Sequence, residues 1–116
     1  MKALVVSSTP CNDVQKCLLA AGSHITTTHD GQDAIAQAER AAFDLAILVS
    51  TGKVMDMVET YFNLRDINPW MEIIILSDEH GTDRTADVIA HAFPNTRSLT
   101  IDGLAKALGV PRDLSQ

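Results

Sequence analysis

Two short runs of apolar residues constrain the fold of this chain most strongly. Leu45–Val49 reads Leu-Ala-Ile-Leu-Val, and residues 73–76 read Ile-Ile-Ile-Leu. A strand with one face in water alternates apolar and polar side chains, whereas a parallel strand covered on both faces is apolar throughout. Between these runs, apolar residues recur at helical spacing, as at Val54, Met57, Val58, Tyr61 and Leu64. Buried strands that alternate with helices predict a parallel sheet covered by helices on both faces.

The rest of the chain continues this alternation. Further strands are predicted over Lys2–Val6, His24–Thr28 and residues 96–101, and apolar helical stripes lie within 11–21, 34–42, 54–65, 85–92 and 104–108. Pro10 suits the first position of the first helix with Thr9 as its cap, and Asp102 can cap the last helix. We therefore predict a three-layer α/β domain of flavodoxin-like type, (βα)5, whose five-stranded parallel sheet has the order 2-1-3-4-5.

Composition narrows the possible functions. The chain has 116 residues, a formal net charge of −6 and 46% hydrophobic residues, which fits one globular domain. Its nine basic residues are scattered, so we expect no direct nucleic-acid binding, which needs clustered Lys and Arg. No apolar run approaches the ~18 residues that would span a bilayer, so we expect no membrane partner. Cys11 and Cys17 form no disulfide framework, and we expect a cytoplasmic protein.

Four segments carry a family resemblance. They are residues 28–35 (Thr-His-Asp-Gly-Gln-Asp-Ala-Ile), 43–48 (Phe-Asp-Leu-Ala-Ile-Leu), 55–56 (Met-Asp) and 73–77 (Ile-Ile-Ile-Leu-Ser). In this register they resemble the receiver domain of bacterial response regulators over nearly the whole chain. The resemblance implies a receiver-like domain over residues 1–109, with residues 110–116 as a tail or the start of a linker.

The same resemblance implies that the phosphorylation site is degenerate. A working receiver has an acidic pair that binds Mg²⁺, an Asp that accepts the phosphoryl group, a hydroxyl and a Lys. These positions fall on Ser7 and Ser8, Val49, Ser77 and Ile101 respectively. Mg²⁺ needs carboxylate oxygens, and valine offers no nucleophile. We therefore expect a pseudo-receiver with no catalytic residues, no metal site and no cofactor, which is not an enzyme.

Two alternatives stay open at this stage. A one-residue slip would place Ser50 at the acceptor position, although serine without an adjacent base is a poor nucleophile. A sensor function is the second, with a small anion or nucleotide bound at the carboxyl end of the sheet over Ser7, Ser8, Thr51, Gly52 and Ser77.

A receiver fold without its switch still offers an interaction surface. In the family, the fourth helix, fifth strand and fifth helix form the usual partner face, which implies residues 82–108 here. Its candidate contact residues are Val88, His91, Ala92, Arg97, Leu99 and Lys106. The expected function is a phosphorylation-independent module for protein–protein interaction or homodimerisation in bacterial signal transduction or transcription regulation. Trp70, after Pro69, is expected to be half-buried by packing.

Overall fold

Five parallel strands form a single sheet in the computed structural model, in the order β2-β1-β3-β4-β5, which confirms the predicted topology. The structure describes residues 1–8, 11–49, 54–76 and 85–109. The strands are β1 (Lys2–Val6), β2 (His24–Thr28), β3 (Leu45–Val49), β4 (Glu72–Leu76) and β5 (Thr96–Leu99). The helices are α1 (Asn12–Ala20), α2 (Gly31–Arg40), α3 (Val54–Ile67), α4 (Thr85–Ala92) and α5 (Ile101–Leu108).

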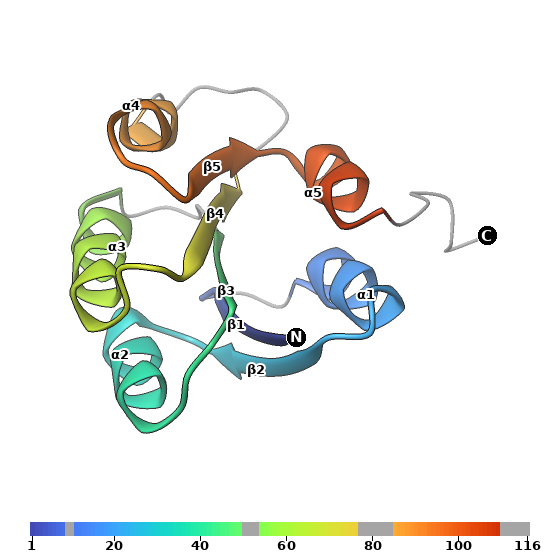
Figure 1. The fold of residues 1–116 in the computed structure, drawn as a ribbon, viewed down its shortest axis with the longest axis horizontal. Coiled ribbons are helices and arrows are strands. Elements are labelled where there is room, and N and C mark those ends of the chain that lie inside the picture. Colours follow the sequence, from blue (N-terminus) through green and yellow to red (C-terminus); the bar gives the residue numbers. More distant parts are fainter. Residues whose placement is uncertain (9–10, 50–53, 77–84, 110–116) are drawn as a thin grey trace.

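The helices divide between the two faces of the sheet, with α1 and α5 on one face and α2, α3 and α4 on the other (Figure 1). Side chains along β1 alternate between these faces, as the period of a strand requires. Leu4 packs toward α2 and α3, while its neighbours Ala3 and Val5 pack toward α1 and α5. All three are fully buried, and this double burial explains why the central strands are apolar throughout.

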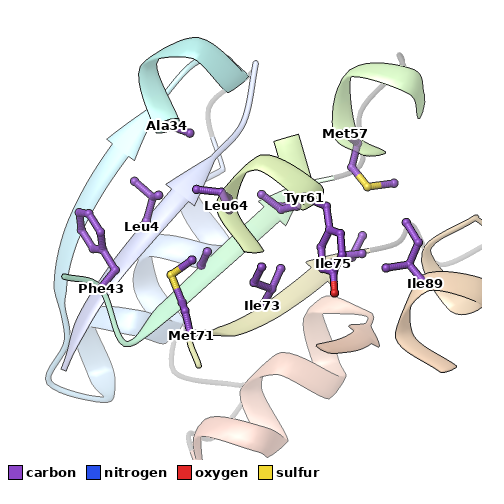
Figure 2. Close-up of a cluster of buried hydrophobic side chains, with 12 residues drawn as sticks. Leu4, Ala34, Phe43, Met57, Tyr61, Leu64, Met71, Ile73, Ile75 and Ile89 are labelled. Carbon is purple, nitrogen blue, oxygen red and sulfur yellow. The ribbon is translucent and has the colours of Figure 1, made fainter. Parts of the chain in front are cut away.

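The larger core lies under α2, α3 and α4. Figure 2 shows Tyr61 and Leu64 of α3 reaching toward Leu4, Ile73 and Ile75 of the sheet. Burial of such side chains contributes about 1.5 to 3 kcal/mol each, so this cluster is a main source of the stability of the fold.

Strand register brings four strand ends to the same edge of the sheet. Val6, the last residue of β1, pairs with Thr28 at the end of β2 and with Leu48 of β3. Val49, which ends β3, pairs with Leu76 at the end of β4. These strands therefore end at one carboxyl edge, where ligands bind in sheets of this type.

Element boundaries differ from the sequence prediction at the start of α1, at the end of β5 and at the cap of α5. The helix α1 begins at Asn12 with Cys11 at its cap position, so it starts later than a helix with Pro10 in its first turn. The strand β5 ends at Leu99 and not at residue 101. Thr100, and not Asp102, caps α5, because its hydroxyl accepts a hydrogen bond from the Gly103 N–H at 3.2 Å and satisfies a donor that the first turn leaves unpaired.

A buried polar cluster ties α3 to the start of β5. The hydroxyls of Tyr61 and Thr96 lie 2.7 Å apart, and the Arg65 guanidinium donates to the Thr96 hydroxyl at 3.0 Å. Tyr61 is fully buried and Thr96 is almost so. These bonds lie at the amino edge of the sheet, opposite the edge at which β1, β2 and β3 end.

Candidate functional site at the carboxyl edge of the sheet

Three of the residues singled out from the sequence lie together at the carboxyl edge. Ser7 follows β1 and is only 3% exposed, and its N–H donates to the Thr28 carbonyl oxygen at 3.0 Å. Ser8 is exposed beside it, and Val49 ends β3 half-buried. The edge therefore presents two hydroxyls and an aliphatic side chain at the positions that the resemblance assigns to three carboxylates. Ser50, Thr51, Gly52 and Ser77 lie outside the described residues.

Ile101, which the resemblance assigns to the receiver lysine, does not lie at the end of a strand as the sequence predicts. Ile101 is the first residue of α5 and not the end of a strand, because the Thr100 cap has already begun the helix. The last residue of β5 is Leu99, which has no amine either. Arg97 is the basic residue of β5, and its guanidinium pairs with Glu72 at 3.0 Å. Since Glu72 begins β4, that charge is held at the amino edge of the sheet, away from Val49.

A cavity of about 830 Å³ opens at this edge, between the ends of β1 and β3, the start of α2 and the amino-terminal half of α3. Its apolar lining comes from both strands and both helices and consists of Val6, Ile35, Leu48, Val49 and Met57. Its polar and glycine lining consists of Ser7, Ser8, His29, Asp30, Gly31, Gln32, Glu59, Thr60 and Asn63.

A close approach of two helices shapes one wall of the cavity. A Cβ atom on Gly31, the first residue of α2, would overlap the Oγ1 atom of Thr60 in α3. Glycine at this position therefore lets α2 begin directly against α3. Asp30 precedes it as the helix cap, and its Oδ1 accepts from the Asp33 N–H at 2.8 Å.

The charged side chains on the described part of the cavity wall are acidic. Asp30 and Glu59 are the carboxylates on its wall, and the described residues that line it include no Lys or Arg. Within the part of the chain that the structure describes, no group of three or more His, Cys, Asp or Glu side chains is arranged to hold a metal ion. Among the described lining residues the carboxylates are Asp30 and Glu59, and Asp30 is used as a helix cap.

Sequence reasoning found the β1 and β3 contributions to this site but missed those of the β2–α2 connection and of α3. It considered the segments after β1, β3, β4 and β5 and left out the one after β2, which holds His29 and Asp30. Because all five strands are parallel, the end of β2 reaches the same edge. The predicted parallel sheet was therefore enough to place the β2–α2 connection at this site. The spacing of Glu59 and Asn63, four residues apart on one helix face, was a second signal.

The partner face predicted over α4, β5 and α5 is largely exposed. Val88 of α4 is 64% exposed, and His91, Ala92, Arg97 and Lys106 are exposed as well. Leu99 is only half-buried and packs against the core under α1 and α5. Among the candidate contact residues, Val88 is therefore an exposed large apolar side chain, and Ala92 is a small exposed one.

Trp70 is far more exposed than expected, at 84%. The sequence prediction of a half-buried side chain is therefore wrong. Trp70 lies in the turn between α3 and β4, where its backbone N–H donates to the Asn68 side chain at 3.0 Å. That bond sets the direction of the turn and leaves the indole without a covering element.

Similarity to solved structures agrees with this architecture. The chemotaxis protein CheY4 of Vibrio cholerae is similar at 26% identity and a TM-score of 0.74, over 93% of this chain and 95% of that one. A response regulator receiver domain protein from Clostridium thermocellum has 17% identity, a TM-score of 0.73 and coverage of 93% and 90%. The response regulator TrrA of Thermotoga maritima, in complex with Mg²⁺ and BeF, has 20% identity, a TM-score of 0.70 and coverage of 92% and 97%.

The chain therefore has the CheY-like fold of response-regulator receiver domains. No protein-family model matches the sequence, and a search of curated proteins finds no match. Among the described residues, no helix combines the length and the apolar character needed to cross a membrane.

Proposed function

We propose that this chain is a pseudo-receiver, a receiver-like signalling domain that works without aspartyl phosphorylation. The observation that carries the proposal is the identity of the residues at the carboxyl edge, where Ser7 and Ser8 follow β1 and Val49 ends β3. Two hydroxyls cannot replace the charge of two carboxylates around Mg²⁺. A valine has no atom that can accept a phosphoryl group. The basic residue of β5, Arg97, is engaged by Glu72 at the opposite edge.

The proposed role is protein–protein interaction or homodimerisation in bacterial signal transduction, with no catalysis. It is supported by the receiver-like fold and by the exposed α4–β5–α5 face, on which Val88 is an exposed apolar side chain and Arg97 and Lys106 are exposed charged ones. Cys11 and Cys17 are not joined in a disulfide, which fits a reducing cytoplasm.

An amide NMR titration tests the loss of the switch. Mg²⁺ and then beryllofluoride, a mimic of the phosphoryl group, are added to the purified chain. Thermotoga TrrA serves as the positive control, since its structure holds both. We expect no saturable shifts at Ser7, Ser8 or Val49. Saturating shifts at these residues on addition of beryllofluoride would overturn the proposal and restore phosphorylation as the switch.

Homodimerisation through α4 has its own test, because two surface positions are matched in exposure. Val88 on α4 is 64% exposed and Leu19 on α1 is 65% exposed, but they lie on opposite faces of the molecule. In sedimentation experiments, Val88→Asp should weaken self-association by at least about tenfold because it buries an unpaired charge. Leu19→Asp should have no effect. Equal effects would exclude α4 as the dimer contact. If the wild-type chain is a monomer at all concentrations, homodimerisation is rejected and binding to a different protein is the role that is kept.

A sensor function is the second candidate, and the cavity at the carboxyl edge favours it. A volume of about 830 Å³ falls within the ~300 to 1,000 Å³ typical of small-molecule sites. A ligand bound only by the native chain raises its melting temperature by mass action. The sequence suggested a small anion or nucleotide, so inorganic phosphate and ATP are the first compounds to test by thermal unfolding.

A further inference from the structure

We propose that the cavity at the carboxyl edge takes a small cationic amphiphile, an aromatic or heterocyclic amine, and not an anion. The inference rests on the second candidate function and names the ligand class for that site. It is independent of whether the α4–β5–α5 face docks a protein.

The apolar floor of the cavity accounts for the amphiphile. Val6 and Leu48 come from adjacent strands, Ile35 from α2 and Met57 from α3. Four aliphatic side chains from four different elements surround one volume that is large enough for a bicyclic ring. A ring placed there removes apolar surface from water at about 25 cal/mol per Å², and the four elements that form the floor belong to the rigid core of the fold.

The rim accounts for the positive charge. Asp30 and Glu59 lie on the wall, Asp30 as the cap residue of α2 and Glu59 in the second turn of α3. The Asp30 Oδ1 atom is used by the Asp33 N–H, which leaves Oδ2 able to accept from an ammonium group. Glu59 is exposed, so its carboxylate can turn toward a ligand at the mouth. Hydrogen bonds between an ammonium and a carboxylate are among the stronger ones available to a protein.

The same groups disfavour an anion. The amino terminus of α2 would by itself attract negative charge, but Asp30 already caps it and Asp33 lies in its first turn. The described lining residues offer no Lys or Arg to balance a phosphate. A nucleotide in this cavity would therefore bring its phosphates close to two carboxylates, and like charges that lie close together repel.

Three indole compounds separate charge from shape. Tryptamine, tryptophol and indole-3-acetate share one ring and carry a positive, a neutral and a negative side group near neutral pH. Each is titrated into the purified chain and followed by amide NMR. Tryptamine should give saturable shifts at Ser8, Ile35 and Thr60, which line the cavity from the end of β1, from α2 and from α3. Tryptophol should bind more weakly than tryptamine, and indole-3-acetate more weakly still.

Charge-removing variants then locate the amine. Asp30→Asn keeps a good helix cap while it removes the charge, and Glu59→Gln keeps the shape of the side chain. Each should weaken tryptamine binding by about 2- to 5-fold, as expected for one partly solvated ion pair, and should leave tryptophol unchanged. Asp66→Asn is the control, since Asp66 is an exposed residue of α3 that does not line the cavity.

The possible results distinguish the hypotheses. Equal binding of tryptophol and tryptamine, or an unchanged affinity in both variants, would refute the role of the carboxylates. Tighter binding of indole-3-acetate would overturn the cationic ligand and keep the sensor function. If none of the three compounds at millimolar concentration causes local shifts, and neither phosphate nor ATP stabilises the chain, the cationic ligand and the sensor function are both rejected. The Mg²⁺ and beryllofluoride titration decides the pseudo-receiver proposal separately.

Discussion

The buried hydroxyl of Thr96 offers the sharpest test of how this fold is held together. It donates to the Pro94 carbonyl oxygen at 3.2 Å, so its single proton is committed there. The Tyr61 hydroxyl, 2.7 Å away, must then be a donor to the Thr96 oxygen, as is the Arg65 guanidinium at 3.0 Å. Thr96→Val removes all three bonds and keeps the β-branched shape that suits a strand.

The expected loss of stability follows from what each partner has left. Arg65 keeps three other acceptors, the carbonyl oxygens of Pro69, Met71 and Asn95. Pro94 is exposed and its carbonyl oxygen can bond to water. Tyr61 is fully buried, and its hydroxyl would lose its partner, which costs about 1 to 3 kcal/mol. With a further fraction of a kcal/mol from Arg65, Thr96→Val should destabilise the chain by about 2 to 3 kcal/mol.

Chemical and thermal unfolding of the variant measure this loss. For a domain of 116 residues, about 2 to 3 kcal/mol corresponds to a fall in Tm of roughly 6 to 15 °C. The slope of the urea transition should stay unchanged, since the exposed surface is the same. Tyr61→Phe should cost less, about 1 kcal/mol, because Thr96 keeps Arg65 and Pro94 as partners.

A double-mutant cycle decides whether the unpaired hydroxyl is the cause. In Tyr61→Phe/Thr96→Val no buried hydroxyl is left without a partner, so the double variant should be more stable than the sum of the single losses by about 1 to 2 kcal/mol. A loss below about 0.5 kcal/mol for Thr96→Val, within the range of neutral surface changes, would refute the reasoning. Strict additivity in the cycle would refute it as well.

Further predictions concern the walls of the site. Gly31→Ala should destabilise the chain by about 1 to 3 kcal/mol, because its Cβ would overlap the Thr60 hydroxyl; Thr60→Ala in the same chain should recover most of the loss, and failure to do so would contradict the packing. Gly103→Ala in α5, whose added Cβ would meet Leu99 and Thr100 at ordinary contact distances, is the control and should be neutral or stabilising by up to about 1 kcal/mol in thermal unfolding. Ser8→Asp/Val49→Asp restores two carboxylates at the edge and should make the Tm rise with added Mg²⁺; no Mg²⁺ dependence would mean that these positions do not correspond to the receiver site.

The fold could be predicted from local patterns because the residue types of each strand depend on whether its faces are buried or exposed. Leu45–Val49 is apolar throughout because the sheet is covered on both faces, and the alternation of strands with helices indicates a parallel sheet, while the order 2-1-3-4-5 is that of the flavodoxin-like type. Helix ends were less predictable. Thr100 and Asp102 are both good caps, and only the point at which β5 leaves β4 selects Thr100.

The candidate site was predictable only in part. Ser7, Ser8 and Val49 follow directly from the positions of strand ends, which local sequence reveals. The contribution of Glu59 depends on how closely α3 approaches α2, and Gly31 permits that approach without any periodic signal in the sequence. Trp70 was misjudged for the same kind of reason, since exposure depends on whether another element covers the turn.

The sequence by itself determined the alternation of buried strands and amphipathic helices, the parallel sheet and the lack of carboxylates at Ser7, Ser8 and Val49. These properties are local, because a few consecutive residues are enough to show the period of a strand or helix and the chemistry of its side chains. Only the tertiary structure decided that Asp30 and Glu59 share one cavity. That pairing joins residues far apart in the chain, and it depends on sheet register and on the close packing of α2 against α3, neither of which is encoded in any short segment.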